Sequence, residues 1–247
     1  MKRIIRSYLC PVFIQMLLAV TAVYVLTRCG TVCGYGTVTG MVLIALGGLS
    51  SALWGCVFQV RHNGKRPADI VKDFFRFKAG LKWYILTAVF ILLSFADVLP
   101  GGSFKAVNAF AIPLLFLKAI AFGGIEELGW RYTFQPYIEK KVPYFAAALI
   151  TFACWGVWHF LFFYIDGSLS SVQPVSFLFS LLTMSFLLSA IYRISGNLWL
   201  CVLAHSLINT FSQVTSGGSR YIGAAEKIVI IALSLYLCEL RNNKENT

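Results

Sequence analysis

Long apolar runs separated by short polar connections dominate the chain. After a basic start that ends at Arg6, one run covers Tyr8–Thr27 with no small-residue cleavage site, so we expect a retained first span and not a signal peptide. Seven more runs are long enough to suggest membrane spans. They cover about Gly40–Val60, Trp83–Leu99, Ala106–Tyr137, Pro143–Ile165, Val175–Tyr192, Leu198–Phe211 and Ile222–Leu240. The pattern predicts an all-α, polytopic membrane helix bundle with about eight transmembrane helices.

Two segments depart from this simple pattern. The run Ala106–Tyr137 is too long for one straight span, so we expect it to tilt or to break near Gly123–Gly124. The connection Arg61–Lys82 carries seven Lys or Arg and two Asp, with apolar residues at partly helical spacing after Pro67. It predicts an amphipathic helix at the cytoplasmic interface; a plain basic loop is the alternative.

Composition supports an integral membrane protein. Apolar residues make up 58% of the 247 residues, charged residues 13%, and the mean hydropathy is +0.76. Soluble domains average about 45–50% apolar and about 25% charged residues. Because the predicted spans use most of the chain, we expect one membrane domain over 1–247, with a motif-bearing core at about 106–212.

The net charge of +11 is explained by membrane topology and needs no nucleic-acid partner. Basic residues gather in alternate connections, and the opposite side carries only Arg28, Lys105 and Arg220. By the positive-inside rule, both termini are predicted to be cytoplasmic. Short loops and the basic amino terminus favour a bacterial plasma membrane, and the lipid bilayer is the first expected partner.

Cysteine usage gives no disulfide or zinc framework. Most of the seven cysteines lie inside apolar runs, where they act as small hydrophobic residues. Cys29 and Cys33 share one connection, and the sequence leaves open whether they pair.

The stretch from Gly123 to Arg131 places two adjacent carboxylates and an arginine in apolar surroundings. In a helix, Glu127 and Arg131 share one face and can pair, whereas Glu126 points about 100° away. Glu126 is then the free carboxylate and Glu127 the structural one. If the helix breaks or unwinds, Arg131 can reach either carboxylate, so the sequence does not decide which glutamate is the base.

Two further predicted spans carry polar groups that are rare at membrane depth. His159 lies in one, and His205 and Asn209 lie four residues apart on one face of another. Intramembrane ionisable groups normally face the interior of a bundle. A lone buried histidine is more often a packing residue, but these groups together with Glu126 suggest a shared site.

This set of residues suits peptide hydrolysis with water as nucleophile. Glu126 can take a proton from water as general base, and a histidine can hold that water or protonate the leaving amine. Asn209, or the other histidine, can donate a hydrogen bond to the oxyanion of the tetrahedral intermediate. The expected site is a cavity between transmembrane helices that opens to the cytoplasm.

Three alternatives stay open. His159, His205 and Glu126 can instead ligate a divalent metal such as zinc, although the chain has no H-E-x-x-H motif and we expect no required cofactor. A non-catalytic membrane immunity or scaffold protein that binds a peptide partner is the second. Proton-coupled transport also explains buried Glu and His residues and is the third.

The chain resembles the CPBP family, the CAAX proteases and bacteriocin-processing enzymes also called Abi. The family pattern is a diglutamate with an arginine four residues beyond the second glutamate, then an aromatic residue and a histidine, then a histidine and an asparagine or aspartate. The matching segments are Glu126-Glu127-x-x-x-Arg131, Trp155-x-x-x-His159 and His205-x-x-x-Asn209. Trp155 stands where phenylalanine is commoner.

The resemblance implies an eight-span intramembrane endopeptidase. It implies Glu126 as the base, His159 and His205 as water-positioning or proton-transfer groups, and Asn209 as oxyanion donor. Glu127 and Arg131 would support them. Substrates of the family include prenylated CAAX peptides and bacteriocin or self-immunity peptides; the substrate here, lipidated or not, and the oligomeric state are not readable from the sequence.

Overall fold

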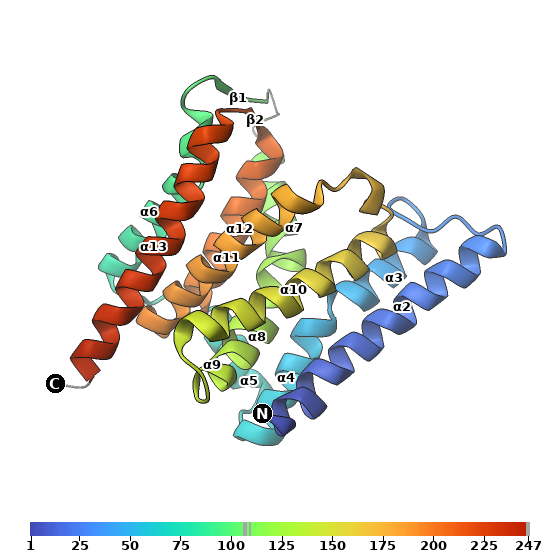
Figure 1. Ribbon diagram of the computed structural model, residues 1–247. Helices are drawn as coiled ribbons and strands as arrows, with labels where there is room; N and C mark the ends of the chain where they lie inside the picture. Colours follow the sequence, from blue (N-terminus) through green and yellow to red (C-terminus); the bar gives the residue numbers. More distant parts are fainter. Residues whose placement is uncertain (106–107, 109, 246–247) are drawn as a thin grey trace.

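The protein folds as a bundle of helices that run between two ends of the molecule (Figure 1). The computed structural model describes residues 1–105, 108 and 110–245, and side chains up to residue 241. Both termini lie toward one end, and a short antiparallel pair of strands, β1 (Gly102–Phe104) and β2 (Thr215–Gly217), lies at the other. The described chain is predominantly helical, as the apolar runs predicted.

The amino-terminal half contains three apolar helical segments and one amphipathic helix. The short α1 (Lys2–Ile4) and a π-helical turn (Ile5–Leu9) lead directly into α2 (Cys10–Arg28). Two helices, α3 (Val38–Gly48) and α4 (Ser50–Asn63), follow with a bend of 42° between them. They are succeeded by α5 (Pro67–Phe74), α6 (Leu81–Leu93) and a 3-10 turn (Ala96–Val98).

The carboxy-terminal half begins with a broken segment. It comprises α7 (Ala111–Phe122), a 3-10 turn (Gly124–Glu126), α8 (Glu127–Gly129), a π-helical turn (Trp130–Phe134) and α9 (Gln135–Glu139). The predicted break at Gly123–Gly124 is confirmed; the predicted start, Ala106, lies outside the described residues. The chain then forms α10 (Tyr144–Asp166), a 3-10 turn (Leu169–Ser171), α11 (Pro174–Ser195), α12 (Leu198–Val214) and α13 (Arg220–Glu245).

The structure bears out a bundle of membrane helices but does not confirm the predicted number of eight spans. Among the described residues, four helices are long and apolar enough to cross a membrane, or up to five if α3 and α4 count as one bent span. Two of the other predicted spans, α6 and α12, are apolar but shorter. The remaining one is interrupted at Gly123, where the chain turns to present its glutamates.

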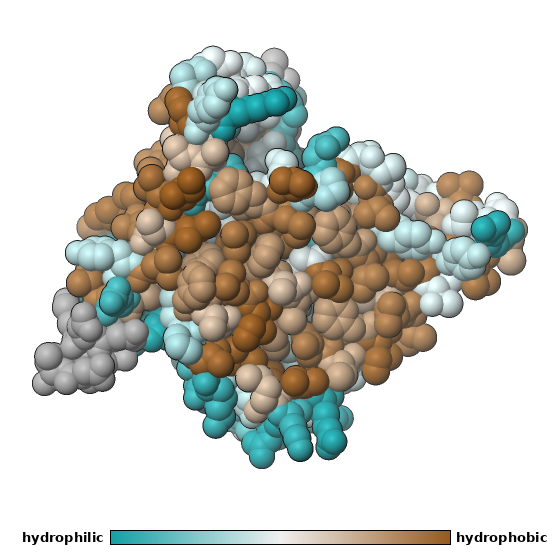
Figure 2. Space-filling model, in the orientation of Figure 1, coloured by the Kyte–Doolittle hydropathy of each residue, from teal (hydrophilic) through white to brown (hydrophobic). Residues whose placement is uncertain are grey.

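The surface has the character of an integral membrane protein. Figure 2 shows hydrophobic residues over the middle of the face in view, with hydrophilic residues concentrated toward its ends. Many large apolar side chains on the helices are exposed, among them Leu18, Leu92 and Leu114. Such an apolar belt is stable only in contact with lipid.

The predicted amphipathic helix is present as α5. Pro67 occupies its first turn, Ile70 and Phe74 are buried, and Asp73 faces the polar side. Partial burial raises the pKa of Asp73, but hydrogen bonds from Lys65 (2.6 Å) and from Tyr132 hold that pKa below its ordinary value. The ionised carboxylate therefore ties α5 to the turn that follows α8.

The seven cysteines are free thiols in this structure. Cys29 and Cys33 lie in the connection between α2 and α3 and are not joined by a disulfide.

Close backbone contact between α4 and α8 depends on two glycines. A Cβ atom on Gly129 would lie 2.4 Å from the Ser51 carbonyl oxygen and 2.5 Å from the Tyr8 hydroxyl, and one on Gly55 would lie 2.7 Å from the Leu128 carbonyl oxygen. Neither backbone can move away without separating the two helices. The small residues of α4 thus set the depth at which the diglutamate sits.

We therefore expect Gly129→Ala to destabilise the protein by about 1–3 kcal/mol, because the added methyl group has no space. Gly156→Ala is the matched control. There the new methyl group would meet only side-chain atoms of Leu178 and Leu181 at 3.4 and 3.6 Å, which is ordinary contact. Thermal unfolding in detergent measures both; equal melting temperatures for the two variants would contradict the close approach.

Candidate functional site

Three segments far apart in the sequence line one cavity of about 430 Å³. Glu126 ends the 3-10 turn after α7, His159 lies on α10, and His205 and Asn209 lie on α12. Residues Trp155, Phe162 and Phe177 form much of the apolar wall. All four residues predicted as catalytic therefore face the same space, and the break at Gly123 is what turns Glu126 into it.

The predicted pair of Glu127 and Arg131 is present and fully buried. The Arg131 Nη1 atom lies 3.2 Å from Glu127 Oε1, and both side chains are 0% exposed. The sequence did not predict a third member: His205 Nδ1 lies 2.7 Å from the same Glu127 oxygen. Glu127 therefore joins its own turn to α12 and fixes the orientation of the His205 ring.

Glu126 has a partner that local spacing could not reveal. The Trp155 indole N–H donates to Glu126 Oε2 at 2.7 Å, and the carboxylate is only 4% exposed. The face of the same indole lies 4.0 Å from the guanidinium carbon of Arg131. Trp155 thus contacts both the carboxylate of Glu126 and the guanidinium of Arg131, which pairs with Glu127. Buried indole N–H groups usually find an acceptor, and this general rule is the only sequence signal that could have pointed to such a bond.

Hydrogen bonds define which nitrogen of each histidine faces the cavity. His159 Nδ1 lies 2.9 Å from the Trp155 carbonyl oxygen, which can only accept, so Nδ1 carries the hydrogen. By the same reasoning, His205 Nδ1–H donates to the Glu127 carboxylate. In the neutral rings each Nε2 atom is then an acceptor, able to hold a water molecule or to receive a proton.

Gly123 brings the polar groups of α12 next to the turn that carries Glu126. A Cβ atom at this position would lie 2.6 Å from Asn209 Nδ2 and 3.1 Å from His205 Nε2. The amide donor of Asn209 and the free nitrogen of His205 therefore both lie against the Gly123 backbone. A side chain here would displace them.

The cavity opens at the end of the molecule opposite to the termini. Its exposed lining residues are Tyr35, in the connection after α2, Lys118 on α7, and Ser212 and Gln213 near the end of α12. Lys118 Nζ lies 5.6 Å from the centre of the Tyr35 ring. Cytoplasmic termini and a cavity open to the cytoplasm were both expected from the sequence, but the two cannot hold together.

The metal alternative has no preformed ligand set. Among the described residues, no three His, Cys, Asp or Glu side chains are grouped so as to hold one metal ion. His205 turns Nδ1 toward Glu127 and His159 turns Nδ1 toward a carbonyl oxygen. These bonds leave both Nε2 atoms free, and a metal-ligating histidine commonly donates its other ring N–H to a carboxylate or a carbonyl oxygen in the same way.

Comparison with known proteins finds a similarity to one family of membrane proteases over the segment that carries the site. The family model described as type II CAAX prenyl endopeptidase Rce1-like matches residues 108–211, the segment from just before α7 to near the end of α12. This segment is similar to the CPBP-family proteases. CAAX prenyl protease 2 of Methanococcus maripaludis is 28% identical over 170 residues, which cover 60% of this chain and 62% of that protein. The match thus spans less than two thirds of the relative.

Trp155 departs from the phenylalanine commoner at this position of the CPBP pattern, and it supplies the N–H group to Glu126. For the peptide cleavage proposed below, we expect Trp155→Phe to lower kcat about 10- to 100-fold with little change in KM, because the carboxylate loses a charge-assisted hydrogen bond while the aromatic wall stays. Trp158→Phe is the control: its indole donates to Ser50 Oγ at 2.9 Å, away from Glu126. Equal kcat values for the two variants would show that the bond to Glu126 is dispensable.

Proposed function

We propose that the protein is an intramembrane endopeptidase that hydrolyses a peptide bond with water activated by Glu126. The observation that carries this proposal is the convergence of Glu126, His159, His205 and Asn209 on one cavity. The family match over residues 108–211 supports the same reaction class. A site of this volume is within the range of small-ligand and peptide pockets, about 300–1,000 Å³.

The chain's own groups suffice for the reaction. Glu126 takes a proton from water, and the resulting hydroxide attacks the carbonyl carbon of the scissile bond. Asn209 Nδ2 donates to the developing oxyanion, and the Nε2 atoms of His159 and His205 hold the water and the departing amine. Collapse of the tetrahedral intermediate breaks the C–N bond, and the proton carried by Glu126 goes to the amine. Glu127 and Arg131 act as positioning residues.

The metal-free form of this mechanism is part of the proposal. It predicts that purified protein in detergent cleaves a quenched-fluorescent peptide library equally well with and without a strong chelator. Loss of cleavage in chelator and recovery with zinc would make His159, His205 and Glu126 ligands instead. Because the archaeal relative is named a CAAX prenyl protease, prenylated CAAX peptides are the first defined substrates to test beside unmodified ones.

Two biological settings follow from this proposal, bacteriocin or peptide processing and self-immunity at a bacterial plasma membrane. A non-catalytic immunity or scaffold protein would need only to bind its partner. Alanine at both His159 and His205 distinguishes a protease from such a binding protein. A protease would lose both peptide cleavage and the protection of the cell, whereas a binding protein would keep the protection.

We further propose that both termini and the basic connection Arg61–Lys82 lie in the cytoplasm, in line with the positive-inside rule. The mouth of the cavity then faces the opposite side of the membrane. We expect a membrane-impermeant maleimide to label the exposed Cys29 in intact cells. A cysteine in place of His62, in a Cys29→Ser and Cys33→Ser background, should label only after permeabilisation. The reverse pattern would place the cavity mouth in the cytoplasm.

A further inference from the structure

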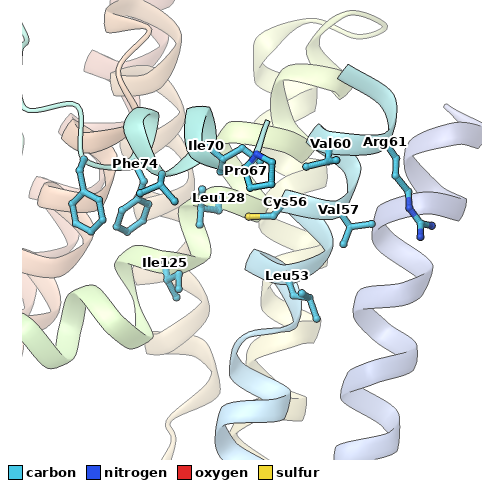
Figure 3. Close-up of a pocket in the computed structure, with 12 residues that line it drawn as sticks. Leu53, Cys56, Val57, Val60, Arg61, Pro67, Ile70, Phe74, Ile125 and Leu128 are labelled. Atoms are coloured by element: carbon cyan, nitrogen blue, oxygen red, sulfur yellow. The ribbon is translucent and has the colours of Figure 1, made fainter. Parts of the chain in front are cut away.

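A second cavity, of about 520 Å³, lies on the outside of the bundle between α4, α5 and the turn that carries the diglutamate. Figure 3 shows Cys56 near its centre, close to Pro67 and Leu128, with Phe74 toward one side and Arg61 toward the other. Apart from Arg61, its lining side chains are apolar or thiol groups. We call it the α4–α5 groove. It is separate from the catalytic cavity, with which it shares no lining residue.

The groove has the shape and surface of a site for an acyl chain. Its outer wall carries large apolar side chains that are exposed, including Val71 at 57% and Phe75 at 49%. Its inner wall is formed by Ile125 and Leu128. Exposed apolar surface of this kind, at the edge of an amphipathic helix, is where hydrocarbon chains of the bilayer are in contact with a membrane protein.

Charge at the rim indicates the headgroup. Arg61 is exposed, and among the described acidic side chains none forms an ion pair with it. Its basic neighbours are already paired, Lys65 with Asp73 at 2.6 Å and Arg66 with Asp69 at 2.8 Å. The segment Arg61–Lys82 carries seven Lys or Arg against two Asp. An anionic group is therefore favoured over a zwitterionic one at this rim.

We propose that the α4–α5 groove binds one anionic phospholipid, with an acyl chain along Cys56 and Leu128 and the phosphate group on Arg61. The acyl chain would then contact the outer side of the turn that holds Glu126 and Glu127. A bound lipid would thus brace α5 and this turn against each other. The proposal does not depend on the protease activity.

Native mass spectrometry of the full-length protein in detergent tests it, with phosphatidylglycerol and phosphatidylcholine present in equal amounts. We expect the wild type to retain one phosphatidylglycerol in preference. Arg61→Gln should reduce that preference about fivefold, the factor for one basic residue at an anionic surface. Arg66→Gln, in the same basic connection but paired with Asp69 and not lining the groove, is the matched control and should retain the preference. Cys56→Trp, which fills the centre of the groove, should abolish retention.

A second readout covers the case in which Cys56→Trp does not fold. In the otherwise native protein, phosphatidylglycerol should slow alkylation of Cys56, and glycerol 3-phosphate, which lacks acyl chains, should not. Equal retention of the two lipids, equal losses in Arg61→Gln and Arg66→Gln, or alkylation insensitive to lipid would each overturn the proposal. Displacement of the lipid by a second copy of the chain or by a lipidated peptide would assign the groove to that occupant instead.

The Glu126→Ala protein separates this proposal from the proposed function. It should retain phosphatidylglycerol as the wild type does, whatever its effect on cleavage. If wild-type protein showed no protease activity but kept the lipid preference, only the proposed function would fail.

Discussion

Replacing Glu126 with glutamine is expected to lower the rate of peptide cleavage about 10²- to 10⁴-fold, which is the usual contribution of a general base. The substitution keeps the size of the side chain and an oxygen that accepts the Trp155 N–H, which lies 2.7 Å from Glu126 Oε2. The amide cannot take a proton from water. The loss should therefore appear in kcat, with substrate binding and the melting temperature close to those of the wild type.

The neighbouring glutamate is the natural comparison. Glu127 Oε1 is already engaged by Arg131 and His205, and among the described contacts its Oε2 has no hydrogen-bond partner. We expect Glu127→Gln to reduce activity as well, but together with stability, because it disturbs the buried pair. If Glu126→Gln cleaved peptide at the wild-type rate and Glu127→Gln did not, Glu127 would be the general base and Glu126 the supporting carboxylate.

Much of the fold was predictable because lipid imposes simple rules on a sequence. Apolar runs located the helices α2, α10, α11 and α13, which are long enough to span. Glycines and an excess of length located the break at Gly123. The predicted number of eight spans is not confirmed, because hydropathy registers α6 and the α7–α9 segment as spans, although these helices are short or interrupted among the described residues.

The candidate site was predictable in its members but not in its contacts. Spacing of four residues gave the Glu127–Arg131 pair, because that distance is local and fixed by the helix. The bonds from Glu127 to His205, 78 residues away, and from Glu126 to Trp155, 29 residues away, depend on how separate helices pack. The direction in which the cavity opens also depends on that packing, which is why the expectation of a cytoplasmic mouth conflicted with that of cytoplasmic termini.

The buried pair makes the second large prediction. Arg131→Met should destabilise the protein by about 3–5 kcal/mol, because Glu127, itself 0% exposed, would lose its cation and keep only His205. The methionine would also give up the contact of the guanidinium with Trp155, 4.0 Å from the ring centre. The matched control is Arg66→Met, whose pair with Asp69 is exposed, with 80% and 38% of the two side chains accessible. It should leave the melting temperature close to that of the wild type, because an exposed ion pair contributes little to stability.

The double variant Glu127→Gln and Arg131→Met identifies the cause. If the cost of Arg131→Met arises from an uncompensated buried carboxylate, removing that charge should recover most of the lost stability. The activity should not recover, because His205 would no longer be held by a carboxylate. Thermal or denaturant unfolding in mixed micelles measures all four proteins. A double variant that is less stable than Arg131→Met alone would mean that Arg131 acts chiefly through its packing on Trp155. The charge of Glu127 would then contribute less to the stability of the site than this aromatic contact does.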